Sequence, residues 1–327
     1  MYTTDHDRMV EDKCYKISHI EKVIAEIHRN FPKYFEDYLK SRESHISADR
    51  VDALRDLFIV DDKGKRLVFD RKTAFLDLHK IAIAEFEKDR ENYIELFDKE
   101  LLEEYKDDPS LFKSVALKVE TAIIRRTIQN KFAKQLDKYR AAFNMSNPSK
   151  LLEVVTKLSH FSENYMGSTY NKNSYENIVN YKDLGFTVLD TEEYTAYGVI
   201  GGGIKSTMLY KNYPEAFSCR SRMGVWALWY LVAKNTFNCE MDSEFLMIDP
   251  KKNITQQNYF YPYELFSFYA LQIYLMLKAE ADKLGIVLDV AYRFVYVEAF
   301  LNFVAIKHID QINTFSKIYE EKSYGWY

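Results

Sequence analysis

Apolar residues recur three and four positions apart over most of the first 145 residues of this 327-residue chain. The clearest case is the series Ile17, Ile20, Val23, Ile24 and Ile27. An α-helix turns once every ~3.6 residues, so this spacing places these side chains on one face of an amphipathic helix. The pattern predicts a mainly α fold with a small β component (α+β). Further helices are expected over Ser110–Phe143, Ser149–Phe161, Pro262–Leu284 and Asp289–Lys307.

Two short segments interrupt the helical pattern. Residues 57–70 place two runs of β-branched and aromatic residues around an Asp-Asp-Lys-Gly turn, which is typical of a β-hairpin. A second strand is expected over Phe245–Ile248, between acidic and basic residues. These segments account for the small β component.

Length and composition predict two domains. A chain of 327 residues exceeds one ordinary small domain, and its aromatic residues are denser after residue 150 than before it. Residues 144–149 combine turn formers with a helix N-cap and first-turn proline at Asn147 and Pro148. We therefore predict a charged helical domain over residues 1–146, which includes the hairpin, and an aromatic-rich, mainly helical domain over 147–327.

The second predicted domain contains a glycine-rich loop at residues 198–203, within the sequence GVIGGGIKST. Glycines allow main-chain N–H groups to turn toward an anion, and a helix N-terminus after them favours phosphate. The stretch departs from the phosphate loop G-x-x-x-x-G-K-[ST], because Ile204 separates the last glycine from the lysine. A hinge or a close main-chain contact would explain the glycines equally well.

Basic and hydroxyl side chains follow the loop. Arginines at the start of an apolar helix are suited to bidentate contact with a phosphate or a carboxylate. Alternatively, the two arginines pair with the acids Glu240, Asp242 or Glu244 and join two structural elements. The predicted phosphate-binding or nucleic-acid-binding residues are Gly201, Gly202, Gly203, Lys205, Ser206, Thr207, Arg220 and Arg222.

A second candidate set surrounds the expected strand at residues 245–248. Carboxylates beside a strand with a lysine nearby could hold Mg²⁺ or Mn²⁺ and steady a scissile phosphate, as in a metal-dependent nuclease. A charged strand edge, which prevents unwanted pairing, is the alternative. The candidate catalytic residues are Asp242, Glu244, Asp249 and Lys251.

A polar patch on the expected helix near residue 298 is a secondary site candidate. Glu298 and Asn302 lie four positions apart in an otherwise apolar segment, where unpaired polar groups are expensive to bury. Arg293 is the expected partner of this patch.

Charge and residue usage exclude several classes. A net charge of −4 argues against a broad sequence-independent grip on nucleic acid, although a local basic groove is compatible with it. The three cysteines and scattered histidines show no metal-ligand spacing, so we predict no metal site and no cofactor outside the nuclease alternative. No signal peptide or membrane span is visible, which favours a cytoplasmic protein.

These observations favour a non-catalytic component that recognises a phosphate-bearing partner, with nucleic acid as the expected partner. The enzyme alternative is the divalent-metal nuclease. The third alternative is a subunit of a larger complex, in which the amphipathic N-terminal helices dock on a protein partner and the aromatic domain forms a homo-oligomer.

Overall fold

The computed structural model describes residues 10–42, 70–130, 136–240, 243–249 and 254–315. These residues form a mainly α fold with one two-stranded antiparallel sheet, which confirms the predicted fold class. Among the helices of these ranges, none has the length and apolar character needed to cross a membrane. The predicted hairpin lies outside the described residues, apart from its last residue.

The described elements follow one another in this order along the chain. They are η1 (Asp12–Tyr15), α1 (Ile17–Lys40), α4 (Arg71–Glu87), α5 (Arg90–Leu96), α6 (Lys99–Glu104), α7 (Pro109–Leu111), the π-helix η2 (Phe112–Glu120), α8 (Ala122–Gln129), α9 (Asp137–Met145), α10 (Pro148–Asn164), η4 (Tyr165–Thr169), η5 (Tyr175–Asn177), η6 (Tyr181–Leu184), η7 (Thr187–Asp190), η8 (Glu192–Tyr194), α11 (Gly202–Asn212), α12 (Arg222–Leu231), β1 (Leu246–Asp249), β2 (Ile254–Gln257), α13 (Tyr263–Lys283), η9 (Val290–Tyr292) and α14 (Arg293–Ile306).

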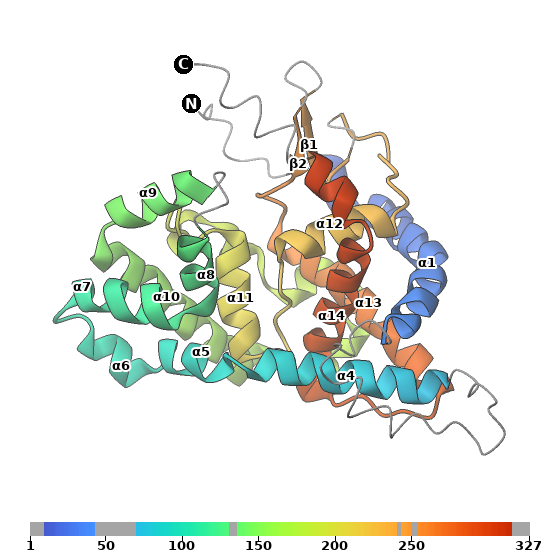
Figure 1. Ribbon diagram of the computed structural model, residues 1–327, viewed down its shortest axis with the longest axis horizontal. Coiled ribbons are helices and arrows are strands. Elements are labelled where there is room, and N and C mark those ends of the chain that lie inside the picture. The colour runs from blue at the N-terminus through green and yellow to red at the C-terminus, as the bar shows by residue number, and fades with distance from the viewer. Residues whose placement is uncertain (1–9, 43–69, 131–135, 241–242, 250–253, 316–327) are drawn as a thin grey trace, which may run out of the picture.

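Helix α14 occupies the centre of one side of the molecule (Figure 1). It packs against α12, α13, α4 and α1, while α4 crosses beneath this group and leads to helices α5–α10 on the other side. The helix is apolar over most of its length because neighbouring helices cover it on several faces. Buried side chains from Val10 to Ile312 form one hydrophobic cluster that includes residues of both predicted domains. The two-domain division itself stays a prediction.

Local signals place several helices where the sequence predicts them. Asn147 caps α10 by accepting hydrogen bonds from the main-chain N–H groups of Ser149 and Lys150, and Pro148 occupies the first turn. The expected C-terminal helices correspond to α13 and to η9 with α14. The expected strand is β1, shifted by one residue, and it pairs with β2 in antiparallel register.

The single helix expected over Ser110–Phe143 is wrong. The chain forms α7, the π-helix η2 and then α8, with an extended break at Thr121. Side chains of α5 take over main-chain groups on both sides of this break: Asn92 donates to the carbonyl of Glu120, and the Tyr93 hydroxyl accepts from the N–H of residue 123. Because these side chains satisfy the freed groups, the helix can stop and restart in the interior.

Candidate functional site

The glycine-rich loop leads directly into α11, whose N-cap is Gly201 and whose first residue is Gly202. The guanidinium of Arg220 lies against Gly202 so closely that a Cβ built on this residue would overlap Nη2 and Cζ of the arginine. A Cβ on Gly203 would make only ordinary contact, 3.7 Å from the main-chain oxygen of Arg220. Gly202 therefore permits a close approach between the first turn of α11 and a buried arginine.

Arg220 and Lys205 are both buried, and both lie near Asp190. Nη1 and Nη2 of Arg220 donate to the main-chain carbonyls of Tyr261 and Tyr259, the second at 2.9 Å. Lys205 Nζ donates to the carbonyl of Leu189 and lies 4.0 Å from Oδ1 of Asp190. Both basic side chains are buried, so protein groups already occupy the terminal nitrogens that a phosphate would need.

Burial dominates the electrostatics of this group. It lowers the pKa of Lys205 to about 8, and it lowers the pKa of Arg220, although the nearby Asp190 carboxylate opposes both shifts. Burial also raises the pKa of Asp190, against the attraction of Lys205 and Arg220. The pKa values of Lys205 and Asp190 thus both shift in the direction that desolvation favours. Loss of water outweighs the attraction between the two groups at 4.0 Å.

Ser206 and Thr207 follow Lys205 in α11, whereas Arg222 begins α12. Ser206 Oγ accepts a hydrogen bond of 3.1 Å from the N–H of Arg220, and Thr207 Oγ1 donates to the carbonyl of Gly203 at 2.8 Å. Arg222 is exposed at the start of α12. The structure brings Lys205, Ser206 and Arg220 together. Phosphate binding by this set stays a prediction, and it would require the ligand to replace main-chain carbonyls.

The alternative pairing of Arg220 with an acid near β1 is not found within the described part of the chain. The guanidinium donates to main-chain carbonyls, and the carboxylate that acts on it most strongly is Asp190. Arg220 therefore joins α11 to the segment before α13 through the main chain.

The predicted nuclease set is only partly described. Asp242 and Lys251 lie outside the described residues, and Asp249 ends β1. Glu244 is buried, and one of its carboxylate oxygens accepts a hydrogen bond of 2.9 Å from the hydroxyl of Tyr261. Nuclease activity stays a prediction.

Glu244 belongs to a group of four potential metal ligands that sequence reasoning missed: Cys14, His19, Cys239 and Glu244. All four residues are buried, and their ligand atoms lie within 4.8 Å of one another. The hydrogen bond between the Cys14 and Cys239 thiols, together with burial, raises the pKa of the Cys14 thiol. The overlooked signal is a repeated spacing, Cys-x₄-His at residues 14–19 and Cys-x₄-Glu at residues 239–244.

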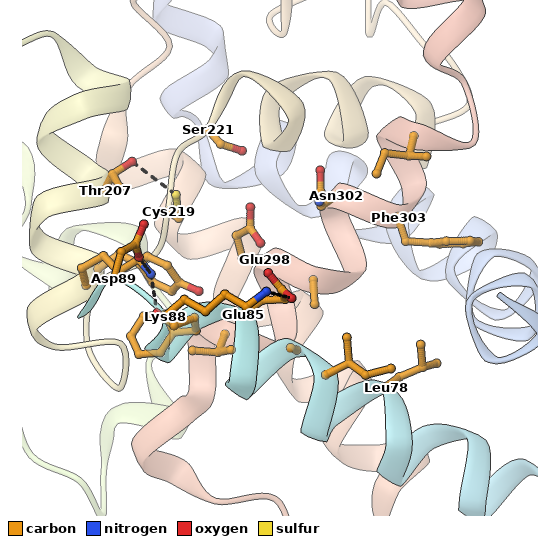
Figure 2. A pocket seen from close by; sticks show the side chains of 18 of the residues that line it. Leu78, Glu85, Lys88, Asp89, Thr207, Cys219, Ser221, Glu298, Asn302 and Phe303 are labelled. Atoms are coloured by element: carbon orange, nitrogen blue, oxygen red, sulfur yellow. Dashed lines mark hydrogen bonds and ion pairs between the residues drawn. The ribbon is translucent and has the colours of Figure 1, made fainter. Parts of the chain in front are cut away.

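A cavity of about 1060 Å³ lies between α4, α11 and α14 (Figure 2). We call it the α14 cavity. Apolar side chains line one part of it, among them Leu78 of α4 and Phe303 of α14. Polar side chains line the rest, and Figure 2 shows Glu298 and Asn302 of α14 on one side and Thr207 on the other. A cavity with apolar walls and a few convergent polar groups is typical of small-molecule sites.

Glu298 differs from the other carboxylates of the lining. These form ion pairs with lysines: Asp37 with Lys307, Glu85 with Lys88, and Asp89 with Lys211. Among the described residues, no side chain or N–H group forms a hydrogen bond or ion pair with the Glu298 carboxylate. Desolvation raises the pKa of Glu298, and attraction from Lys211 opposes this shift. Within the described part of the chain, the charge of Glu298 thus has no bonded counterion.

Arg293, the expected partner of the Glu298 patch, lies elsewhere. It is fully buried and donates to the main-chain carbonyl of Glu215 and, at 3.4 Å, to the carboxylate of Glu176. Its guanidinium also lies 4.6 Å from the ring centroid of Tyr175. The polar patch of α14 is thus divided: Arg293 joins the helix to the preceding loops, while Glu298 lines the cavity.

Cys219 contributes a thiol to the wall of the α14 cavity. Its thiol lies 3.6 Å from Thr207 Oγ1, and burial raises its pKa to about 12. The thiol is therefore protonated near neutral pH, whereas a nucleophilic cysteine needs a lowered pKa. The cavity is suited to binding rather than to thiol chemistry.

No family model matches this chain, and the searches of curated proteins and of solved structures find no similar protein.

Proposed function

We propose that the protein binds a small organic molecule carrying an amino group in the α14 cavity. The observation that supports this most directly is the Glu298 carboxylate, which lines the cavity without a bonded counterion among the described residues. Glu298 is partly exposed, and desolvation raises its pKa, so its charged form would gain from an ion partner. An ammonium group from a ligand would supply the missing partner.

The rest of the cavity fits such a ligand. Its volume of about 1060 Å³ is close to the upper end of the range for small-molecule sites. Leu78 and Phe303 offer apolar contact to the body of the molecule, and the Asn302 amide offers a donor and an acceptor near Glu298. Lys211 attracts Glu298 from a distance, but its ammonium group is bonded to Asp89 and to a main-chain carbonyl.

Thermal unfolding with matched ligands tests the proposal. Phenethylamine and 3-phenylpropionate have similar apolar bodies and opposite charges, so we expect the amine to raise the melting temperature and the acid to leave it unchanged. At a ligand concentration about 100 times its Kd, binding stabilises the folded state by about 2.7 kcal/mol. Longer aliphatic amines and their acids extend the series.

Two variants separate Glu298 from the general charge of the cavity. Glu298→Gln should abolish the response to the amine, because the neutral amide cannot pair with an ammonium group. Glu85→Gln removes the same charge from a carboxylate that is paired with Lys88, and it should keep the response. An equal response in Glu298→Gln, or no response of the wild type to any amine in the series, would contradict the proposal.

Recognition of nucleic acid through Lys205, Ser206 and Arg220 remains a separate proposal from the sequence. Binding of labelled single- and double-stranded nucleic acid across a salt series should weaken with a measurable slope if phosphates are neutralised. Addition of magnesium or manganese to the same samples tests the nuclease alternative by cleavage. The absence of any salt-dependent binding would leave a protein partner as the remaining prediction.

A further inference from the structure

The N-terminal segment meets the loop between α12 and β1 through two pairs of side chains. Cys14 Sγ lies 3.9 Å from Cys239 Sγ, and His19 Nε2 bonds to a carboxylate oxygen of Glu244. Each pair joins residues 225 positions apart, so the two Cys-x₄ segments lie side by side. The four ligand atoms form a compact group within 4.8 Å of one another.

The separation of the two sulfur atoms fits a tetrahedral zinc ion. With Zn–S bonds of about 2.3 Å, two thiolates of a tetrahedral site lie about 3.8 Å apart. The Cys14–Cys239 separation of 3.9 Å agrees with this value and is far longer than a disulfide bond of about 2.05 Å. Two sulfur ligands also favour zinc over magnesium or calcium, which prefer oxygen.

Hydrogen bonds from neighbouring side chains hold Glu244 in place, as is usual for a metal ligand. The second carboxylate oxygen of Glu244 accepts hydrogen bonds from Tyr261 at 2.9 Å and from Tyr269 at 3.5 Å. Such outer contacts fix the orientation of a ligating carboxylate. Next to Cys239, the carbonyl of Asn238 accepts from Lys13 Nζ, which ties the loop to the N-terminal segment.

We propose that Cys14, His19, Cys239 and Glu244 bind one structural zinc ion that fastens the N-terminal segment to the loop before β1. Four protein ligands complete the tetrahedron, and the burial of all four leaves no open position for a substrate. The hydrogen bond between His19 and Glu244 would be replaced by a bond from each side chain to the metal. This site is distinct from the α14 cavity and does not depend on the proposed amine ligand.

Metal analysis of the full chain gives the first test. Protein expressed with added zinc should contain about one equivalent of tightly held zinc after dialysis. Cys239→Ser should reduce the zinc content at least tenfold. Cys219→Ser, which changes the third buried cysteine outside the group, should retain it. Equal zinc content in all three proteins would overturn the assignment of the site.

A second measurement begins with the wild-type chain, so that its first result does not depend on the folding of a variant. After zinc is removed by a chelator, Co²⁺ should restore the lost thermal stability and give the intense visible bands of tetrahedral cobalt with thiolate charge transfer. Tyr261→Phe should weaken Co²⁺ binding by about 10–100-fold, because the outer hydrogen bond to Glu244 is lost. A folded metal-free protein without Co²⁺ binding, or a Cys14–Cys239 disulfide in the purified chain, would overturn the proposal.

Discussion

Replacing Gly202 by alanine tests the reason for the glycine-rich loop. The new Cβ would overlap Nη2 and Cζ of Arg220 and lie 3.0 Å from Nε, so the guanidinium must leave its position. The displaced arginine would lose its hydrogen bonds to the carbonyls of Tyr259 and Tyr261. The same substitution at Gly203 meets only the main-chain oxygen of Arg220 at 3.7 Å and serves as the matched control.

The expected magnitude follows from these contacts. Each hydrogen bond to a charged group contributes about 1.5–3 kcal/mol, so loss of both costs about 3–6 kcal/mol. Alanine recovers at most about 1 kcal/mol through its higher helix propensity. Gly202→Ala should therefore lower the free energy of unfolding by about 2–5 kcal/mol, whereas Gly203→Ala should raise it by up to about 1 kcal/mol.

Urea unfolding followed by tryptophan fluorescence measures this difference, since Trp226 and Trp229 are buried in α12. The midpoint of Gly202→Ala should fall while the m-value stays unchanged. In an Arg220→Met background, the additional effect of Gly202→Ala should largely disappear, because the clashing guanidinium is absent. Gly202→Ala as stable as Gly203→Ala would refute the close-approach explanation.

Three further changes test the charges inside the protein. The pKa of Lys205 is about 8 in the folded state and near 10.5 in the unfolded state. Between these values the unfolded state binds more protons, so the free energy of unfolding rises with pH. Urea unfolding should show a rise of about 2 kcal/mol from pH 7 to 9.5, and this rise should be absent in Lys205→Met. Because the pKa of Glu298 is raised in the folded state, its contribution to folding stability is full below the unfolded pKa near 4.5 and is lost at higher pH. The melting temperature of Glu298→Gln should therefore exceed that of the wild type at pH 8 and equal it near pH 4. Arg293→Met should cost about 1.5–3 kcal/mol in urea unfolding, because the Glu215 carbonyl loses its buried charged donor while Glu176 keeps Tyr274 and Lys278, and Arg293→Lys should not restore this loss.

Local signals in the sequence predict much of the helical framework. The cap at Asn147 and Pro148 acts on residues within one turn, so the start of α10 can be read directly from neighbouring letters. The strand β1 is also predicted, to within one residue, because its apolar run is a local signal. The break at Thr121 is missed because the groups that stabilise it, such as Asn92 and Tyr93, come from a different helix.

The candidate sites are less accessible to sequence reasoning, because their members come together only in the folded chain. Glu298 can be recognised as a costly polar residue on an apolar helix, but the position of Arg293 depends on loops that fold around it. The Cys14–Cys239 contact joins positions 225 residues apart, so the repeated Cys-x₄ spacing alone does not show that the two segments meet. The glycine density correctly indicates a special backbone position. The close contact that requires Gly202, however, is with an internal side chain, Arg220.

Tyr261 connects two of the buried polar groups. Its main-chain carbonyl accepts a hydrogen bond from Arg220, and its hydroxyl donates to Glu244 beside the cysteines. Cys219, the residue before Arg220, lines the α14 cavity. Displacement of Arg220 therefore acts on a residue that also orients a proposed zinc ligand. Because residues that share a partner are energetically coupled, changes at Gly202 and at Glu244 should not be treated as independent, even though they lie in separate elements of the fold.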